Sequence, residues 1–249
     1  MNKILVVIPY LSKEAQGSEL ELAVAGWIKH FKTPHQVVII GDWDEHVARL
    51  IQAPDVSFIN CPRIQPFEDQ YLPHLDIVHK FREVMRWAHR TDGFIYACDD
   101  MYAVKDFTIY DVKIPKFDIQ ECTIPEFDWT KESGWMRDLG KTRSVCWGLG
   151  KTTSNWVCHL PVWYDWGKLV HVLDTFNCDE ISYVVENLYF NEIFPQRMYP
   201  CEPKYRKQVN TATPDFNSTD EVEAIWITNG NCGWSERLEN ILRKHYGQD

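Results

Sequence analysis

Two adjacent carboxylates, Asp99 and Asp100, directly follow the short apolar run at residues 94–98. Two carboxylates so close together repel each other, and a divalent cation relieves that repulsion. Mg²⁺ and Mn²⁺ prefer oxygen ligands, and Mg²⁺ is commonly shared between one or two carboxylates and substrate phosphates. A metal that bridges a diphosphate also stabilises the charge that develops when the diphosphate leaves. The pair therefore predicts a metal and phosphate site; the alternative is a turn in which Asp99 is a cap and Asp100 is solvated.

A third metal ligand is predicted at His159, in the apolar segment VCHLP. A neutral imidazole there could bind the metal or contact a phosphate. A histidine among apolar residues is also often a core residue, so both interpretations stay open.

Acidic residues in the second half of the chain are candidates for the general base that takes a proton from an acceptor hydroxyl. Asp179, Glu180 and Glu186 lie in the region expected to face an acceptor. Glu180 and Asp179 are the catalytic candidates, with Glu180 preferred. The competing interpretation is that acidic residues on helices are solvated.

Basic residues and strand ends predict how a phosphorylated donor would be held. Arg63 and Lys80 could approach a diphosphate, although a surface charge is an equally good interpretation of each. Asp42 ends the second apolar run, where an acidic group can accept hydrogen bonds from a ribose or a base edge. The remaining donor-binding candidates are Tyr10, Ser12, Asn60 and Asp99.

These side chains need a framework that brings separate strand ends together. An apolar run at 3–9 predicts a first strand, and strands predicted at 35–41 and 55–60 follow it, alternating with helical patterns at 18–31 and 45–52. This order is typical of a doubly wound parallel sheet, which binds ligands at the carboxyl ends of its strands. An α/β fold with a mostly parallel sheet flanked by helices is therefore predicted.

The rest of the chain supplies further elements. Ser18 and Glu21 match a capping box at the start of the first helix. Residues 104–134 are polar and predict an extended excursion or hairpin. Helices are predicted at 76–90, 162–174, 179–194 and 234–246, and residues 135–156 predict a helix followed by a Gly-rich turn. Strands are predicted at 93–98, 157–161 (returning His159 to the site) and 224–228.

Composition bounds the class of protein. The 249 residues suit a single α/β domain, and the net charge of −10 makes nucleic-acid binding unlikely without excluding it. No apolar run is long enough for a signal peptide or a transmembrane helix. The eight cysteines form no CxxC pair, so we expect free thiols, no zinc ribbon and a cytoplasmic location.

Three segments resemble a known group of enzymes. DGFIYACDDMY resembles the metal-binding strand of GT-A-type glycosyltransferases and is most similar to that of the Stealth group of capsular-polysaccharide sugar-phosphate transferases. HLPVWYDWGKL and IWITNGNCGWSERLENILRKHYGQD resemble later segments of that group. The arginine-bearing N-terminal motif of the group is not evident in residues 9–20, which favours ordinary glycosyl transfer.

The resemblance implies one GT-A-like (Rossmann-like) domain over residues 1–249. Residues 1–102 would form the nucleotide-binding half and residues 103–249 a C-terminal acceptor-side lobe. Asp99 and Asp100 would hold the metal and the donor diphosphate, with His159 nearby.

We therefore expect a metal-dependent glycosyltransferase that moves a sugar from a nucleotide-sugar donor to a carbohydrate or other hydroxyl acceptor. One alternative is transfer of a sugar 1-phosphate. Another is glycosylation of a nucleic-acid base, in which Trp163 and Trp166 could stack on a flipped base. A carbohydrate-binding domain without catalysis is the non-enzyme alternative.

Overall fold

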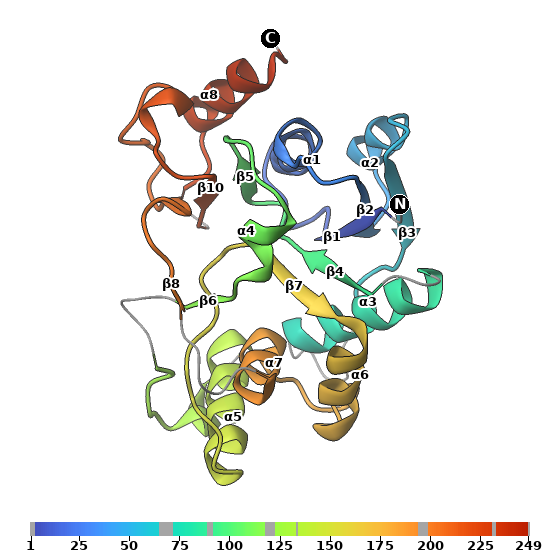
Figure 1. The fold of residues 1–249 in the computed structure, drawn as a ribbon, viewed down its shortest axis with the longest axis vertical. Coiled ribbons are helices and arrows are strands. Elements are labelled where there is room, and N and C mark those ends of the chain that lie inside the picture. The colour runs from blue at the N-terminus through green and yellow to red at the C-terminus, as the bar shows by residue number, and fades with distance from the viewer. Residues whose placement is uncertain are drawn as a thin grey trace.

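The computed structural model has a central sheet with helices on both faces and two smaller sheets beside it (Figure 1). It describes residues 3–64, 72–88, 92–117, 123–132, 134–193, 199–230 and 233–248.

The central sheet has the strand order β3-β2-β1-β4-β7. The first four strands run parallel, and β7 pairs antiparallel with β4. The predicted α/β fold with a mostly parallel sheet is confirmed. The strands are β1 (Ile4–Tyr10), β2 (His35–Gly41), β3 (Val56–Asn60), β4 (Gly93–Tyr96) and β7 (Val162–Asp165).

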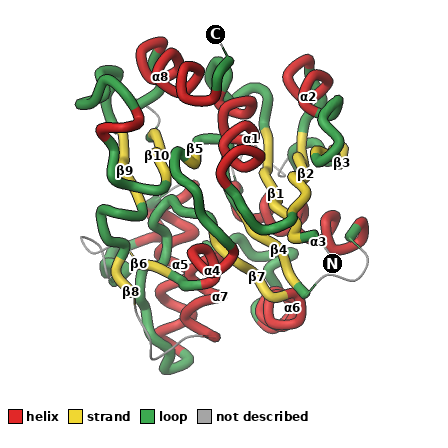
Figure 2. The backbone as a smooth tube through the Cα atoms, turned by 45° about the horizontal axis from the view of Figure 1, so that its top comes forward, coloured by secondary structure: helices red, strands yellow, loops and turns green. Residues whose placement is uncertain are grey.

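Each face of this sheet has its own hydrophobic core, because successive side chains of a strand point to opposite faces. Val6 and Ile8 of β1 pack toward α1 (Glu19–His30) and α2 (Glu45–Leu50). Leu5 and Val7 pack toward the opposite helices, and Figures 1 and 2 show the two groups of helices on either side of the sheet. The opposite helices are α3 (Pro73–Trp87), α5 (Gly134–Gly148), α6 (Trp166–Thr175) and α7 (Val185–Ile193).

A second sheet, of order β5-β10-β9, packs with α8 (Glu236–Tyr246) against α1. The Tyr246 hydroxyl donates to the Ala103 carbonyl at 2.8 Å, which ties α8 to β5. The remaining elements are β5 (Met101–Ala103), β9 (Arg206–Val209), β10 (Trp226–Asn229), the paired strands β6 (Lys116–Phe117) and β8 (Tyr199–Pro200), α4 (Ile109–Lys113), and the 3-10 helices Trp129–Lys131 and Thr219–Glu221.

Several expectations for the second half were wrong. Residues 157–161 form no strand, and His159 has a left-handed backbone with φ of 48°. The segment 162–165, expected to be helical, is β7, which fills the hydrogen-bonding edge of β4. The last helix before residue 194 begins at Val185, not at 179.

The predicted capping box at Ser18 is absent. The Ser18 hydroxyl makes no cap bond; instead it donates to Glu239 at 2.8 Å and accepts from Arg243 at 2.5 Å. The side chain thus joins α1 to α8, a tertiary contact that the local sequence pattern does not encode.

Gly41 allows the end of β2 to lie against β1. Its φ is +152°, and a Cβ at this position would stand 1.8 Å from the Tyr10 carbonyl oxygen. An L side chain here therefore meets both backbone strain and a clash with the main chain.

We expect Gly41→Ala to lower the free energy of unfolding by about 3 kcal/mol or more, because the neighbouring strand must move. Gly148→Ala is the matched control, since no heavy atom lies within 4 Å of its added Cβ, and we expect a change below about 1 kcal/mol. Urea unfolding followed by circular dichroism measures both variants. Equal stability of the two variants would contradict this account of the strand end.

Candidate functional site

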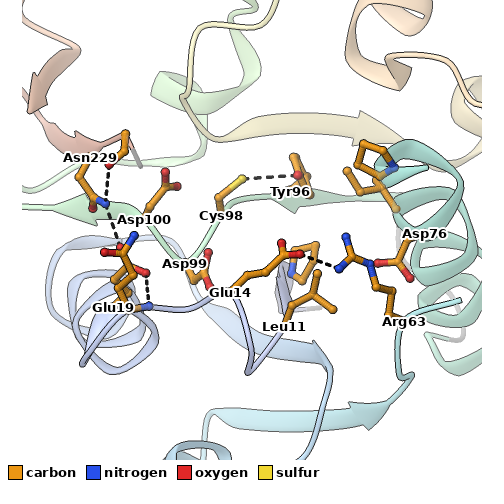
Figure 3. A pocket seen from close by; sticks show the side chains of 15 residues that line it. Leu11, Glu14, Glu19, Arg63, Asp76, Tyr96, Cys98, Asp99, Asp100 and Asn229 are labelled. Atoms are coloured by element: carbon orange, nitrogen blue, oxygen red, sulfur yellow. Dashed lines mark hydrogen bonds and ion pairs between the residues drawn. The ribbon is translucent and has the colours of Figure 1, made fainter. Parts of the chain in front are cut away.

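A cavity of about 290 Å³ opens beside Asp99 and Asp100, next to the carboxyl ends of β1 and β4 (Figure 3). Figure 3 shows these two carboxylates toward one end of the cavity and Arg63 with Asp76 toward the other. The residues that line it are Pro9, Leu11, Glu14, Gln16, Glu19, Arg63, Pro73, Asp76, Ile77, Tyr96, Cys98, Asp99, Asp100, Asn229 and Gly230.

The turn that carries Asp99 and Asp100 is held between two sheets. On its N-terminal side the Ala97 amide donates to the Val7 carbonyl at 3.0 Å, which continues the pairing of β4 with β1. On its C-terminal side β5 begins at Met101 and pairs antiparallel with β10. Because both flanks are fixed, the two carboxylates are held at the rim of the cavity.

The cavity is strongly acidic. Glu14, Glu19 and Asp76 line it together with the Asp99-Asp100 pair, and Arg63 is the only cationic residue among its described lining residues. A phosphate group would therefore meet net repulsion in this cavity unless a cation accompanied it.

Two of these carboxylates have charged partners. Glu14 forms an ion pair with Arg63 at 2.6 Å. Asp76 pairs with the Lys80 ammonium and accepts a hydrogen bond from the Ile64 amide at 3.0 Å. Their negative charge is largely offset.

Glu19 is buried and accepts hydrogen bonds instead. It bonds with the Gln16 amide at 2.7 Å and with the Asn229 side-chain amide at 2.9 Å. The Asn229 oxygen in turn accepts from the Tyr102 hydroxyl at 2.7 Å. Beside this chain, Oδ1 of Asp100 is buried, and no described residue hydrogen-bonds with it.

The protein favours the protonated forms of Asp99 and Asp100. Burial raises the pKa of Asp99 to about 8, and the charges of Asp100 and Glu19 add to the effect. Burial raises the pKa of Asp100 to about 7, with Glu19 as a second cause. Both side chains lie deep in the protein, yet part of their surface stays accessible because they border the cavity.

Two carboxylates with an orphaned buried oxygen fit a divalent cation that takes its other ligands from a substrate. Among the residues described, no three His, Cys, Asp or Glu side chains lie close enough to form a metal site by themselves. The three predicted metal ligands are thus not assembled: Asp99 and Asp100 are together, whereas His159 lines a neighbouring cavity.

The donor-binding candidates at the ends of β1 to β3 lie at the expected edge of the sheet but do not line the cavity. Tyr10 is buried and donates to Asp44 at 2.5 Å, because it points to the face opposite Pro9 and Leu11. Asp42 accepts from both the amide and the hydroxyl of Ser12, each at 3.1 Å. Asn60 is exposed at the end of β3.

The two basic candidates have different positions. Arg63 lines the cavity, as a phosphate contact requires. Lys80 is completely buried, lies outside the lining and pairs with Asp76. Its expected contact with a diphosphate is therefore not supported, and its visible role is to hold the carboxylate that receives the Ile64 amide.

The structure does not bring Asp179 and Glu180 to the site. Asp179 forms an ion pair with Arg82 at 2.6 Å, and Glu180 accepts from Asn177 at 2.8 Å near the surface. Neither lines the cavity at Asp99 and Asp100 nor the one at His159.

The sequence did not point to Glu19 or Asn229, and it favoured Glu180 and Asp179 over Glu186 as the catalytic candidates. Glu186 lines the cavity at His159, and burial raises its pKa well above the usual range. Asn229 ends the apolar strand β10, so a polar residue at a strand end was a usable signal. Nothing in the sequence marks Glu19 as part of the site.

Solved structures share this arrangement of strands and helices. An active-site mutant of LgtC matches with a TM-score of 0.50 and 12% identity, over 98% of this chain and 95% of that one. The fold is GT-A-like. The bifunctional glycosyltransferase WbbM, in its apo structure, also matches with a TM-score of 0.50 and 12% identity, over 99% of this chain and 52% of that one.

The chain thus spans about half the length of WbbM. The glycosyltransferase GlyE of Streptococcus pneumoniae TIGR4 matches with a TM-score of 0.39 and 15% identity, over 82% of this chain and 46% of that one. At 12% identity the likeness to LgtC and WbbM shows the fold alone. No protein-family model and no curated protein matches the sequence, and these comparisons lend the Stealth resemblance no support.

No helix in the described part of the chain has the length and apolar character needed to cross a membrane.

The raised pKa values of Asp99 and Asp100 predict the pH dependence of folding. A carboxyl whose pKa in the folded state exceeds its usual value of 3.8 stabilises the fold least when it is ionised. The wild-type protein, kept in a chelator, should therefore lose stability as the pH rises from about 4 through 7 and 8. Asp99→Asn with Asp100→Asn should remove this loss.

The quantity to compare is the unfolding free energy of the double variant minus that of wild type. We expect this difference to be larger at pH 8.5 than at pH 5 by roughly 2 kcal/mol or more. Denaturant titrations at both pH values measure it. Asp92→Asn, at an exposed aspartate, serves as the control and should give no such difference. If the difference in unfolding free energy between the double variant and wild type is the same at both pH values, the pKa values of Asp99 and Asp100 are not raised.

Proposed function

We propose that this protein is a metal-dependent glycosyltransferase that moves a sugar from a nucleotide-sugar to a hydroxyl acceptor. The observation that carries the proposal is the state of the Asp99-Asp100 pair. The other lining carboxylates have a cation or hydrogen-bond donors as partners, whereas Oδ1 of Asp100 has no described partner. A bound cation would supply that missing partner.

A nucleotide-sugar suits this cavity better than an uncharged sugar does. Its diphosphate brings oxygens that complete the coordination of a cation shared with Asp99 and Asp100. Arg63, at the other end of the cavity, would face the same phosphates. The GT-A-like fold agrees with this assignment at the level of the fold.

We place the nucleotide in residues 1–102, over the ends of β1 to β3 where Tyr10, Ser12, Asp42 and Asn60 lie. Residues 103–249 would supply the acceptor side of the single domain. The described cysteines are free thiols, which fits the cytoplasmic location that we propose.

In the transfer, the bond between the anomeric carbon of the sugar and the donor phosphate oxygen breaks, the acceptor oxygen bonds to that carbon, and the acceptor hydroxyl proton passes to a phosphate oxygen of the leaving group. The nucleoside diphosphate leaves with the electron pair. When bound, the divalent cation would offset this developing charge. Arg63 would add a guanidinium to the same phosphate group, and the Asp99-Asp100 turn, fixed by two sheets, would keep the phosphate in place.

Nucleotide binding should depend on the metal. With Mn²⁺ present, one of UDP, GDP or CMP, or a sugar carried by it, should raise the melting temperature by several degrees at saturating concentration; without Mn²⁺ the rise should be much smaller. Differential scanning fluorimetry measures the shift. Asp99→Asn with Asp100→Asn should abolish the Mn²⁺-dependent part.

The same samples identify the reaction. Release of a nucleoside diphosphate on incubation with the stabilising nucleotide-sugar and acceptors is the expected outcome. Release of a nucleoside monophosphate would instead show that the reaction is sugar-phosphate transfer and not glycosyl transfer. If no nucleotide stabilises the protein and the double variant behaves as wild type, the proposal is wrong.

Arg63 should contribute to affinity for the diphosphate. We expect Arg63→Gln to weaken nucleoside-diphosphate binding in the presence of Mn²⁺ by about tenfold, the scale of one charge-assisted hydrogen bond. Arg49→Gln is the matched control, because Arg49 also pairs with a glutamate but lies on α2 outside the cavity. Isothermal titration calorimetry compares the two; equal affinities would remove Arg63 from the donor site.

A further inference from the structure

A second cavity, of about 420 Å³, adjoins the one at Asp99 and Asp100. Five residues line both cavities, so the two spaces share a wall: Pro73, Ile77, Tyr96, Cys98 and Gly230. A volume of this size is within the range of small-molecule sites.

The lining of this second cavity is mostly apolar and aromatic. Trp135 is 39% exposed, so the cavity opens toward solvent near its ring. Apart from the shared wall, the lining residues are His74, Phe81, Met101, Trp135, Val157, His159, Leu160, Tyr164, Val184, Val185 and Glu186.

Two buried polar atoms in the lining have no hydrogen-bond partner among the described residues: Oε1 of Glu186 and Nε2 of His74. Buried polar groups are almost always hydrogen-bonded, so each such orphan needs an explanation. Part of the Glu186 side chain remains accessible although it lies deep, because it faces this cavity. A ligand in the cavity would supply the missing partner.

The cavity carries little charge. Burial raises the pKa of Glu186 and lowers the pKa of His74 to about 3, so both groups favour their uncharged forms. Five carboxyl side chains and Arg63 line the cavity at Asp99 and Asp100, so the two spaces suit ligand parts of different character.

We propose that the second cavity binds the acceptor, and that this acceptor is a hydroxyl compound with an apolar body, such as an aromatic alcohol, whose hydroxyl bonds with Glu186. The acceptor role rests on the proposed function. A monosaccharide fits less well, because each of its several hydroxyls loses water on entry and the apolar lining offers few partners in return. The shared wall at Tyr96 and Cys98 sets such an acceptor beside the donor.

The binding part of the proposal is testable without metal or nucleotide. The probe is 2-naphthol, a fluorescent aromatic alcohol, titrated into the full chain in the presence of a chelator. Glu186→Leu should weaken its binding about tenfold, because the hydroxyl loses its partner, while Glu186→Gln, which keeps a donor and an acceptor, should restore most of it. Naphthalene, which lacks the hydroxyl, should bind wild type and Glu186→Leu alike.

Two further variants place the probe in the cavity. Val157→Trp adds a large ring to a half-buried loop position in the lining and should abolish binding. Glu192→Leu is the matched control on the same helix, since Glu192 pairs with Lys151 outside the cavity, and it should leave affinity unchanged. Circular dichroism checks that each variant is folded.

The outcomes separate the two proposals. Asp99→Asn with Asp100→Asn should leave 2-naphthol binding intact while abolishing metal-dependent nucleotide binding. If 2-naphthol binds as described but no nucleotide does, the proposed function fails and the apolar cavity remains a ligand site.

Two results would overturn the inference itself. One is that methyl β-D-glucopyranoside binds and displaces 2-naphthol. The other is that neither Glu186→Leu nor Val157→Trp alters the binding of 2-naphthol. With the donor identified and Mn²⁺ present, mass spectrometry should detect glycosylated 2-naphthol, and its absence despite binding would overturn the acceptor role.

Discussion

Carboxyl groups that the fold leaves uncompensated concentrate at the turn between the central sheet and the second sheet. The chain leaves β4 and enters β5 within four residues, so Asp99 and Asp100 cannot move away from Glu19 without breaking the pairing of one sheet. Burial disfavours ionisation of both carboxyls, with added repulsion from Asp100 and Glu19 at Asp99 and from Glu19 at Asp100. Carboxyl groups with strongly shifted pKa values in a cavity are common at functional sites, where a ligand offsets the charge that the fold leaves without a partner.

Among the carboxyl groups that line the cavity, those at the Asp99-Asp100 turn are the ones without a cationic partner in the described residues, apart from Glu19, which is hydrogen-bonded. Lys80 offsets Asp76 from inside the protein, and Arg63 offsets Glu14 at the rim. The Arg63–Glu14 pair attaches the segment after β3 to the β1–α1 loop, and the hydrogen bond from the Ile64 amide to Asp76 attaches it to α3. Compensation is therefore nearly complete at one end of the cavity and lacking at the other, which sets the direction in which a polar ligand with a bound cation would lie.

The sequence was a good guide where local patterns are continuous. The run at residues 4–8 is apolar without interruption, as buried parallel strands are. Asp99 and Asp100 are adjacent in sequence, so their mutual repulsion could be inferred directly. The four-residue run at 162–165 fits a strand or a helix equally well, and only the open edge of β4 decides it. The pairing of Asp179 with Arg82, and the approach of Asn229 to Glu19, arise from tertiary contacts that no local pattern encodes.

The two adjoining cavities also bear on a problem that every glycosyl transfer to an alcohol faces, namely competition from water. An acceptor with an apolar body displaces water from the second cavity more completely than a polyhydroxylated one, because the lining offers water few hydrogen bonds in return. Glu186 would then present the acceptor hydroxyl where few competing water molecules remain, and Tyr96 and Cys98, which line both cavities, mark where that dry space meets the donor cavity. The protein can thus exclude water from the second cavity and still keep a hydrated cation at Asp99 and Asp100, since the two events occur in different cavities.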